Sequence, residues 1–216
     1  MYQDDDTKAF NALVGLCTHH VPKKFNIPPL SHRIQVISPM YRGIVGVDNL
    51  NTELQKRLNP DQESLNFGNR IIRVRDKVMQ IRNNYEKDVY NGDIGRVALL
   101  DRPNYTVAVD FDGRLVYYQK EDLNELVLAY AISVHKSQGS EYDAVIMPLM
   151  TQHFIMLQRN LFYTALTRAK KMSVIVGTYK ALHIAIKNDK LVQRNGLLKE
   201  KLMEIGRITD LDKTKP

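Results

Sequence analysis

The chain changes texture twice along its length, and this change limits its fold more than any other feature. Ile34-Gln-Val-Ile37 is a short β-branched run, and apolar side chains then recur at helical spacing from Val45 to Leu58. Short β-rich runs follow one another from Arg70 to about Leu128, and strand and helix patterns alternate again after that point. The pattern predicts an α/β domain interrupted by a small antiparallel β-barrel or sheet.

The sequence pattern predicts helices and strands over defined residue ranges. A first helix is expected over residues 7–20 and ends before Pro22, and a strand over 34–37 and a helix over 45–58 follow. The β-rich runs are 71–74, 77–81, 95–100, 105–111 and 114–118, and Asp112-Gly113 is a hairpin signal between the last two. The later elements are a strand at 145–147, helix 155–169, strand 172–177, helix 179–186 and a weakly amphipathic helix from Asn195 to Ile205.

Composition bounds the class of protein. With 216 residues and 44% hydrophobic side chains, the chain can build one substantial core. Lysine and arginine number 31 against 24 acidic residues, and the resulting net charge of +7 is typical of a protein that binds polyanions. Cys17 is the single cysteine, which excludes an intramolecular disulfide and a cysteine-rich metal site. No stretch approaches the ~18 apolar residues of a membrane span, so we expect a cytoplasmic protein without membrane contact.

Two polar segments, residues 131–141 and 159–171, carry the candidate chemistry. In the first, donor groups crowd into a turn that ends in glycine and follows an apolar run, an arrangement that suits the phosphates of a nucleic-acid backbone. Glu141 can accept a hydrogen bond from a ribose hydroxyl. In the second, polar side chains recur every three or four residues along one helix face. Arg168 on such a helix can reach across an interface to the γ-phosphate of a nucleotide.

The same segments resemble the motifs of a known family. Ile132-Ser-Val-His-Lys-Ser-Gln-Gly-Ser-Glu141 resembles motif V of superfamily 1 helicases, and Leu161-Phe-Tyr-Thr-Ala-Leu-Thr-Arg-Ala-Lys170 resembles motif VI. Val36-Ile-Ser-Pro-Met-Tyr-Arg-Gly43 is similar to motif IV of the RecD-like branch, and residues 68–95 are similar to the same branch. The resemblance implies the C-terminal motor domain of an ATP-dependent 5′-3′ DNA helicase of the exodeoxyribonuclease V alpha type.

The resemblance also implies domain bounds and residue roles. Residues 1–91 and 125–206 would form the second RecA-like domain, a parallel-sheet domain of the P-loop NTPase type. Residues 92–124 would form an inserted SH3-like barrel, and 207–216 a flexible tail. Arg42 and Arg168 would contact the γ-phosphate, and Glu141, Gly139 and Gln138 would lie near the nucleotide. The implied contacts with single-stranded DNA are Ser133, His135, Lys136, Ser137 and Thr164, with Asn83, Asn84 and Tyr85 on a loop that faces the strand.

Two departures from the family pattern qualify these roles. The chain has no Gly-x-x-x-x-Gly-Lys-Ser/Thr loop and no Asp-Glu pair at a strand end. We therefore expect ATP and Mg²⁺ to be held mainly by a preceding RecA-like domain of the same polypeptide, with no metal ligands here and no useful ATP hydrolysis by this chain alone. Two alternatives remain open: a non-catalytic nucleic-acid-binding module, or the helicase half of a relaxase-type protein. Only a motor role explains an Arg168 that is exposed at an interface and unpaired by a carboxylate.

Overall fold

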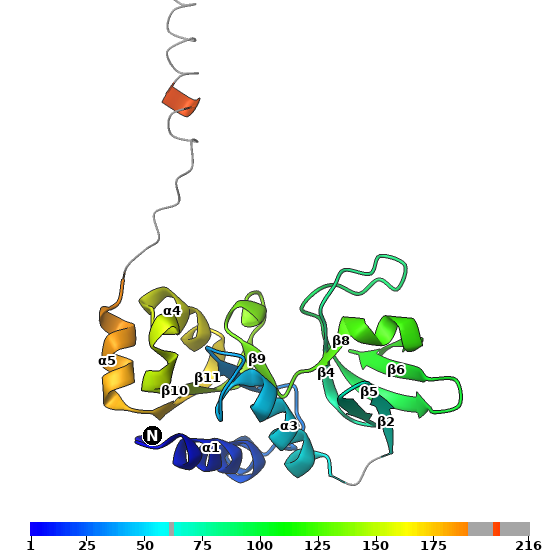
Figure 1. Cartoon of the computed structure of the whole chain (residues 1–216), viewed down its shortest axis with the longest axis horizontal. Helices are drawn as coiled ribbons and strands as arrows, with labels where there is room; N and C mark the ends of the chain where they lie inside the picture. The colour runs from blue at the N-terminus through cyan, green and yellow to red at the C-terminus, as the bar shows by residue number, and fades with distance from the viewer. Residues whose placement is uncertain (61–62, 190–200, 204–216) are drawn as a thin grey trace, which may run out of the picture.

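The computed structural model describes residues 1–60, 63–189 and 201–203, and two β-sheets organise them (Figure 1). The first sheet has four parallel strands in the order β11-β10-β1-β9. Its strands are β1 (Ile34–Ser38), β9 (Ala131–Ser133), β10 (Tyr142–Leu149) and β11 (Ala169–Gly177). This sheet confirms the α/β class that the sequence predicts.

Helices cover both faces of the parallel sheet, which explains why its strands are almost continuously apolar. Val36 packs with α1 and α3 on one face, and the next residue, Ile37, packs with α4 and α5 on the other. The helices are α1 (Asp6–Gly15), α3 (Val47–Leu58), α4 (Arg159–Leu166) and α5 (Tyr179–Lys187).

The second sheet is antiparallel, has the order β7-β6-β5-β4-β8, and forms a separate lobe (Figure 1). Its strands are β4 (Lys77–Gln80), β5 (Ile94–Asp101), β6 (Thr106–Phe111), β7 (Arg114–Tyr118) and β8 (Leu126–Leu128). The hairpin of β2 (Ser64–Phe67) and β3 (Arg70–Arg73) adds Leu65 and Ile72 to the core of this lobe. Within the described residues β7 and β8 remain edge strands, so the sheet is open and not a closed barrel. It extends beyond the expected insert 92–124 on both sides, because β4 precedes that range and β8 follows it.

Two helices differ from the sequence prediction. The first does not end before Pro22: a π-helical turn, η1 (Leu16–His20), and a short helix, α2 (Val21–Phe25), continue it to a left-handed cap at Asn26. Pro22 is tolerated because it occupies the first turn of α2, where a backbone N–H is not needed. The helix predicted over 155–169 is also shorter. The 3₁₀ segment η4 (Thr151–Met156) precedes α4, and Ala169 already pairs with Tyr142 as the first residue of β11.

The apolar run 126–132 is divided between the two sheets. Its first part is β8 of the antiparallel sheet, and its last part belongs to β9 of the parallel sheet. Ala129 and Tyr130, which we call the connector, join the two strands, and Gln35 Nε2 donates to both connector carbonyls at 3.1 Å. The connector is therefore a point at which the two lobes meet.

Among the helices that the structure describes, none has the length and apolar character needed to span a membrane. The helix expected from Asn195 and the tail 207–216 lie outside the described residues, apart from 201–203.

Candidate functional site

Arg168 lies just beyond α4, where the chain turns into β11. Its Nε donates to the carbonyl oxygen of Thr164 at 3.2 Å and its Nη1 to that of Ser140 at 3.2 Å, while Nη2 is 3.4 Å from Oγ1 of Thr167. The guanidinium is half-buried, its acceptors are neutral, and no carboxylate in the described ranges forms an ion pair with it. These contacts orient the side chain and leave its charge uncompensated, which is what an anion-binding arginine requires.

The turn at residues 138–141 lies beside Arg168. Gln138, Gly139 and Glu141 are exposed, and the backbone of Gly139 has the positive φ of +84° that favours glycine. The Glu141 carboxylate forms an ion pair with Lys170 Nζ at 3.0 Å. Both side chains are more than half exposed, so this pair contributes little and a ligand can displace it. The structure thus brings together three expected nucleotide-binding residues and Arg168.

Arg42 lies at the opposite edge of the parallel sheet. It is exposed and follows the carboxyl end of β1, whereas Arg168 precedes the amino end of β11, which runs parallel to β1 on the other side of β10. Ser38 Oγ donates to the carbonyl of Val45 at 2.8 Å and holds the Arg42 loop at this edge. Arg42 and Arg168 therefore lie at opposite ends of the parallel strands, and their expected shared contact with one phosphate stays a prediction.

A cavity of about 260 Å³ lies where the two sheets meet, and two of the expected DNA-contacting residues line it. Ser133 Oγ accepts a hydrogen bond from Tyr41 Oη at 3.2 Å and one from the backbone N–H of Lys136 at 3.4 Å. Lys136 is half-buried, and this burial lowers the pKa of its ammonium group. Arg70 and Met79 line the cavity from the antiparallel lobe. The cavity therefore combines an apolar lining with two cationic side chains, Arg70 and Lys136, and one carboxylate, Asp48.

Other expected DNA contacts lie outside this cavity. His135 is exposed. Ser137 is fully buried and its hydroxyl donates to the carbonyl of Val134 at 2.7 Å, so it points inward. The Thr164 hydroxyl donates to the carbonyl of Asn160 at 2.8 Å within α4, and its own carbonyl accepts from Arg168. Thr164 therefore lies on the Arg168 side of the sheet.

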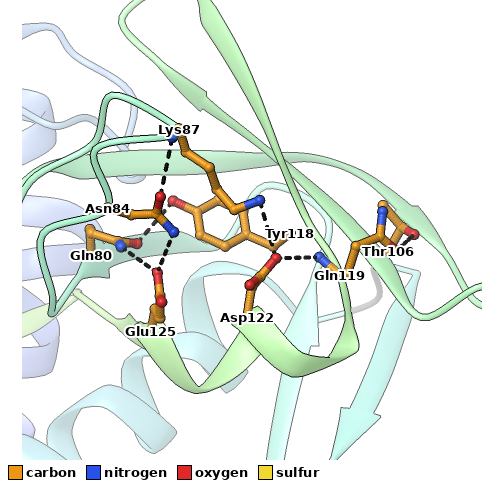
Figure 2. A network of polar contacts seen from close by, with 8 residues as sticks. All are labelled: Gln80, Asn84, Lys87, Thr106, Tyr118, Gln119, Asp122 and Glu125. Atoms are coloured by element: carbon orange, nitrogen blue, oxygen red, sulfur yellow. Dashed lines mark hydrogen bonds and ion pairs between the residues drawn. The ribbon is translucent and has the colours of Figure 1, made fainter.

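The loop that follows β4 presents Asn83, Asn84 and Tyr85, and a polar network fixes its base (Figure 2). Asn84 Nδ2 donates to Glu125 Oε2 at 3.2 Å, and Lys87 Nζ forms an ion pair with Asp122 at 3.1 Å. The amide of Asn84 is thus already engaged, and Asn83 Oδ1 accepts from the N–H of Asn91. Tyr85 is 76% exposed and its ring meets Tyr90 edge-on. Tyr85 and Asn83 are both exposed, and of the three expected residues Tyr85 presents the largest exposed side chain to a ligand.

Sequence reasoning missed Tyr41, Asn51 and Arg70, which also line the cavity. Arg70 donates to the carbonyls of Leu126 at 2.6 Å and Leu123 at 3.2 Å, so it is fixed to the antiparallel lobe. The adjacency of Tyr41 to the singled-out Arg42 was an available signal, but nothing local marks the other two.

Within the described ranges, no group of three or more His, Cys, Asp and Glu residues is placed to hold a metal ion. Mg²⁺ is usually held by one or two carboxylates together with water and substrate phosphates, so the expected place of the ion on a preceding domain stays a prediction.

Family models and curated relatives match the sequence of both lobes. The family model for the ATP-dependent RecD-like DNA helicase SH3 domain matches residues 50–111, and the model for the UvrD-like helicase C-terminal domain matches residues 128–176. The ATP-dependent RecD2 DNA helicase of Deinococcus radiodurans is 38% identical over 165 residues, which are 76% of this chain and 23% of that protein. The RecBCD enzyme subunit RecD of Mycolicibacterium smegmatis is 33% identical over 158 residues, 73% of this chain and 27% of that protein.

Solved helicase structures share the fold. Pif1 from Bacteroides in complex with ADP-AlF3 and ssDNA aligns with a TM-score of 0.52 at 18% identity, over 92% of this chain and 54% of that chain. A structure of two Pif1 helicases coordinating at forked dsDNA also aligns at 0.52 and 18% identity, over 98% of this chain and 53% of that chain. This chain spans about a quarter of the length of the two curated relatives. The chain belongs to the RecD-like superfamily 1 helicases and carries a C-terminal helicase domain together with an SH3-like domain.

Proposed function

We propose that this chain is the C-terminal motor domain of a cytoplasmic, ATP-dependent DNA helicase that moves 5′ to 3′ along single-stranded DNA. Arg168 reaches the γ-phosphate of an ATP held by a preceding RecA-like domain, and its planar guanidinium stabilises the charge that develops during phosphoryl transfer. The observation that carries the proposal is the state of Arg168, which is oriented by neutral acceptors and paired with no carboxylate in the described ranges.

The two edges of the parallel sheet bind different ligands in this proposal. Arg168 and Glu141 lie at the amino end of β10, so we assign this edge to the nucleotide. Ser133 and Lys136 lie toward the other edge and line the cavity, so we assign that side to the DNA backbone. Arg42 follows β1 on the DNA side, next to Tyr41, which donates to Ser133. We therefore assign Arg42 to a DNA phosphate instead of to ATP.

The ligands follow from the same division. The chain itself offers ATP an arginine and a polar turn but no phosphate loop, so the preceding domain would hold the triphosphate and Mg²⁺, and this chain alone would hydrolyse little ATP. The Bacteroides Pif1 structure with ADP-AlF3 and ssDNA shows a protein of the same fold with both classes of ligand. That pairing supports single-stranded DNA as the polymer bound here.

The test is ATPase activity, with and without single-stranded DNA, of a polypeptide that extends this chain at its amino end through a phosphate-loop domain. Arg168→Ala is expected to lower kcat by about a thousandfold or more, as for other arginine fingers. Arg159→Ala, at the first residue of α4, is the matched control. Its guanidinium donates to the carbonyl of Ile186 and pairs with Asp189 within the domain, so its loss should leave kcat unchanged.

Equal activity with and without Arg168 would refute the motor assignment. DNA binding that survives in that case would favour the alternative of a non-catalytic nucleic-acid-binding module. A second pair of variants tests the division of edges. Arg42→Ala should weaken DNA binding and leave the KM for ATP unchanged, and the reverse result would return Arg42 to the nucleotide.

A further inference from the structure

A buried carboxylate that forms no ion pair with any described residue lies where the two lobes meet. Asp76, directly before β4, is fully buried and accepts four hydrogen bonds. Its Oδ1 accepts from Asn59 Nδ2 at 2.8 Å and Tyr130 Oη at 2.7 Å, and its Oδ2 accepts from Gln55 Nε2 at 2.6 Å and the N–H of Arg73 at 2.7 Å. All four partners donate, so together they satisfy an ionised carboxylate.

These donors come from three different parts of the fold. Gln55 lies on α3 and Asn59 caps it, so both belong to the parallel-sheet lobe. Arg73 is the last residue of β3 in the other lobe. Tyr130 belongs to the connector between β8 and β9. One carboxylate therefore ties α3, the antiparallel lobe and the connector together, and a relative shift of the lobes would break bonds to a buried charge, which is costly.

The connector has further fixed contacts. The N–H of Ala129 donates to the carbonyl of Lys77 at 2.8 Å, and Gln35 binds both connector carbonyls. Asn51 on α3 then binds the backbone of Ala131 in both directions, donating to its carbonyl and accepting from its N–H at 2.9 Å each. The first residue of β9 is thus fixed to α3 by two hydrogen bonds.

The connector and the start of β9 lead directly to the residues proposed to bind the DNA backbone. Ser133 ends β9 three residues after Tyr130, and it lines the cavity together with Lys136. The opposite wall of the cavity belongs to the antiparallel lobe that Asp76 holds. We infer that Asp76 and Tyr130 are positioning residues that set the spacing of the two cavity walls, so that DNA affinity depends on them although neither contacts DNA. This inference rests on the proposed function, because it takes the cavity to be part of the DNA path.

Two tyrosine variants of the 216-residue chain provide a matched test. Tyr130→Phe removes the hydroxyl bound to Asp76, and Tyr142→Phe removes an equally buried hydroxyl, at the start of β10, that has no hydrogen-bond partner among the described residues. Affinity for a fluorescein-labelled oligothymidylate is measured by anisotropy, and hydrogen–deuterium exchange is followed over residues 126–137. Tyr130→Phe should weaken binding about three- to thirtyfold, the range expected for mutations that act through a coupled network, and should speed exchange. Tyr142→Phe should change neither.

The outcomes separate the two proposals. Equal loss of affinity in both variants, or unchanged affinity and exchange in Tyr130→Phe, would overturn the positioning role. Faster exchange in Tyr130→Phe, with no oligothymidylate binding even by the unaltered chain, would overturn the proposed DNA-binding function and the inference with it. Asp76→Asn is a second variant: its amide presents two donors where only donors surround it, so its effect on affinity should exceed that of Tyr130→Phe.

Discussion

The buried Lys77 makes the stability of this chain depend on pH in a way that can be calculated. Its side chain is almost fully buried, and Nζ donates to Gln35 Oε1 at 2.6 Å and to the carbonyl of Ile34 at 3.1 Å. Two acceptors match the two protons of a neutral amine and leave one proton of an ammonium unsatisfied. The pKa of Lys77 is lowered to about 7, mainly by burial; Cys17 opposes this change and the charge of Arg96 adds to it.

The sign of the effect follows from proton binding. Between pH 7 and pH 10 the unfolded chain carries a protonated Lys77 and the folded chain a neutral one, so the unfolded state binds more protons and stability rises with pH. The limiting slope is about 1.4 kcal/mol per pH unit. With a folded pKa of about 7 and an unfolded value of about 10.4, the gain from pH 7 to pH 9 is about 2 kcal/mol. Below pH 6 both states are protonated and the contribution is constant.

Urea unfolding followed by far-ultraviolet circular dichroism measures this gain, with Lys77→Met as the comparison at each pH. The free energy of unfolding of the original chain should rise relative to Lys77→Met by about 2 kcal/mol between pH 7 and pH 9. The comparison cancels the opposite contribution of Cys17, whose buried thiol has its pKa raised to about 12 and whose unfolded form ionises first. A difference between the two proteins that stays constant across this range would refute the reasoning, since Lys77 would then be charged in both states.

Two further predictions concern stability and DNA contact. Gly95→Ala should lower the free energy of unfolding by about 1–3 kcal/mol, because the added Cβ would lie 2.6 Å from Val109 Cγ1. Gly15→Ala is the control and should not destabilise the chain, because the nearest atom to its Cβ is 3.9 Å away. Urea unfolding of both variants measures the difference, and equal midpoints would contradict the packing argument. Tyr85→Ala should weaken oligothymidylate binding by about 1–3 kcal/mol, as for the loss of one stacked base, without changing the free energy of unfolding by more than about 0.5 kcal/mol; unchanged affinity would remove Tyr85 from the DNA path.

Local signals in the sequence predicted much of the fold. The strands of the antiparallel lobe from residue 94 to 118 agree with the predicted runs to within one residue, because alternating β-branched residues and turn signals are local. Asp112 and Gly113 both adopt positive φ, as the Asp-Gly signal predicts for a tight hairpin. α3 likewise follows from its apolar spacing and begins two residues later than predicted.

The elements that could not be predicted depend on long-range contacts. Residues 126–132 have one uniform apolar pattern, and the change of sheet at the connector depends on Gln35, which lies far away in the sequence. The network around Asp76 joins residues from α3, β3 and the connector, and no periodicity brings them together. The motif strings located the candidate site, but they could not show at which edge of the sheet each residue lies.

The placement of Arg42 and Arg168 bears on how such a domain would move DNA. The parallel strands between them are buried on both faces in continuous apolar cores, and the connector to the antiparallel lobe is fixed by hydrogen bonds. If a bound nucleotide displaces Arg168, the packed strands would transmit this displacement to Ser133. The parallel-sheet domain would then move as one rigid body. The step along DNA would then arise from rotation of this whole domain against its neighbour. On this argument, variants at the DNA edge such as Lys136→Ala should change DNA affinity without changing the affinity for nucleotide, whereas loosening the connector should reduce the coupling between the two.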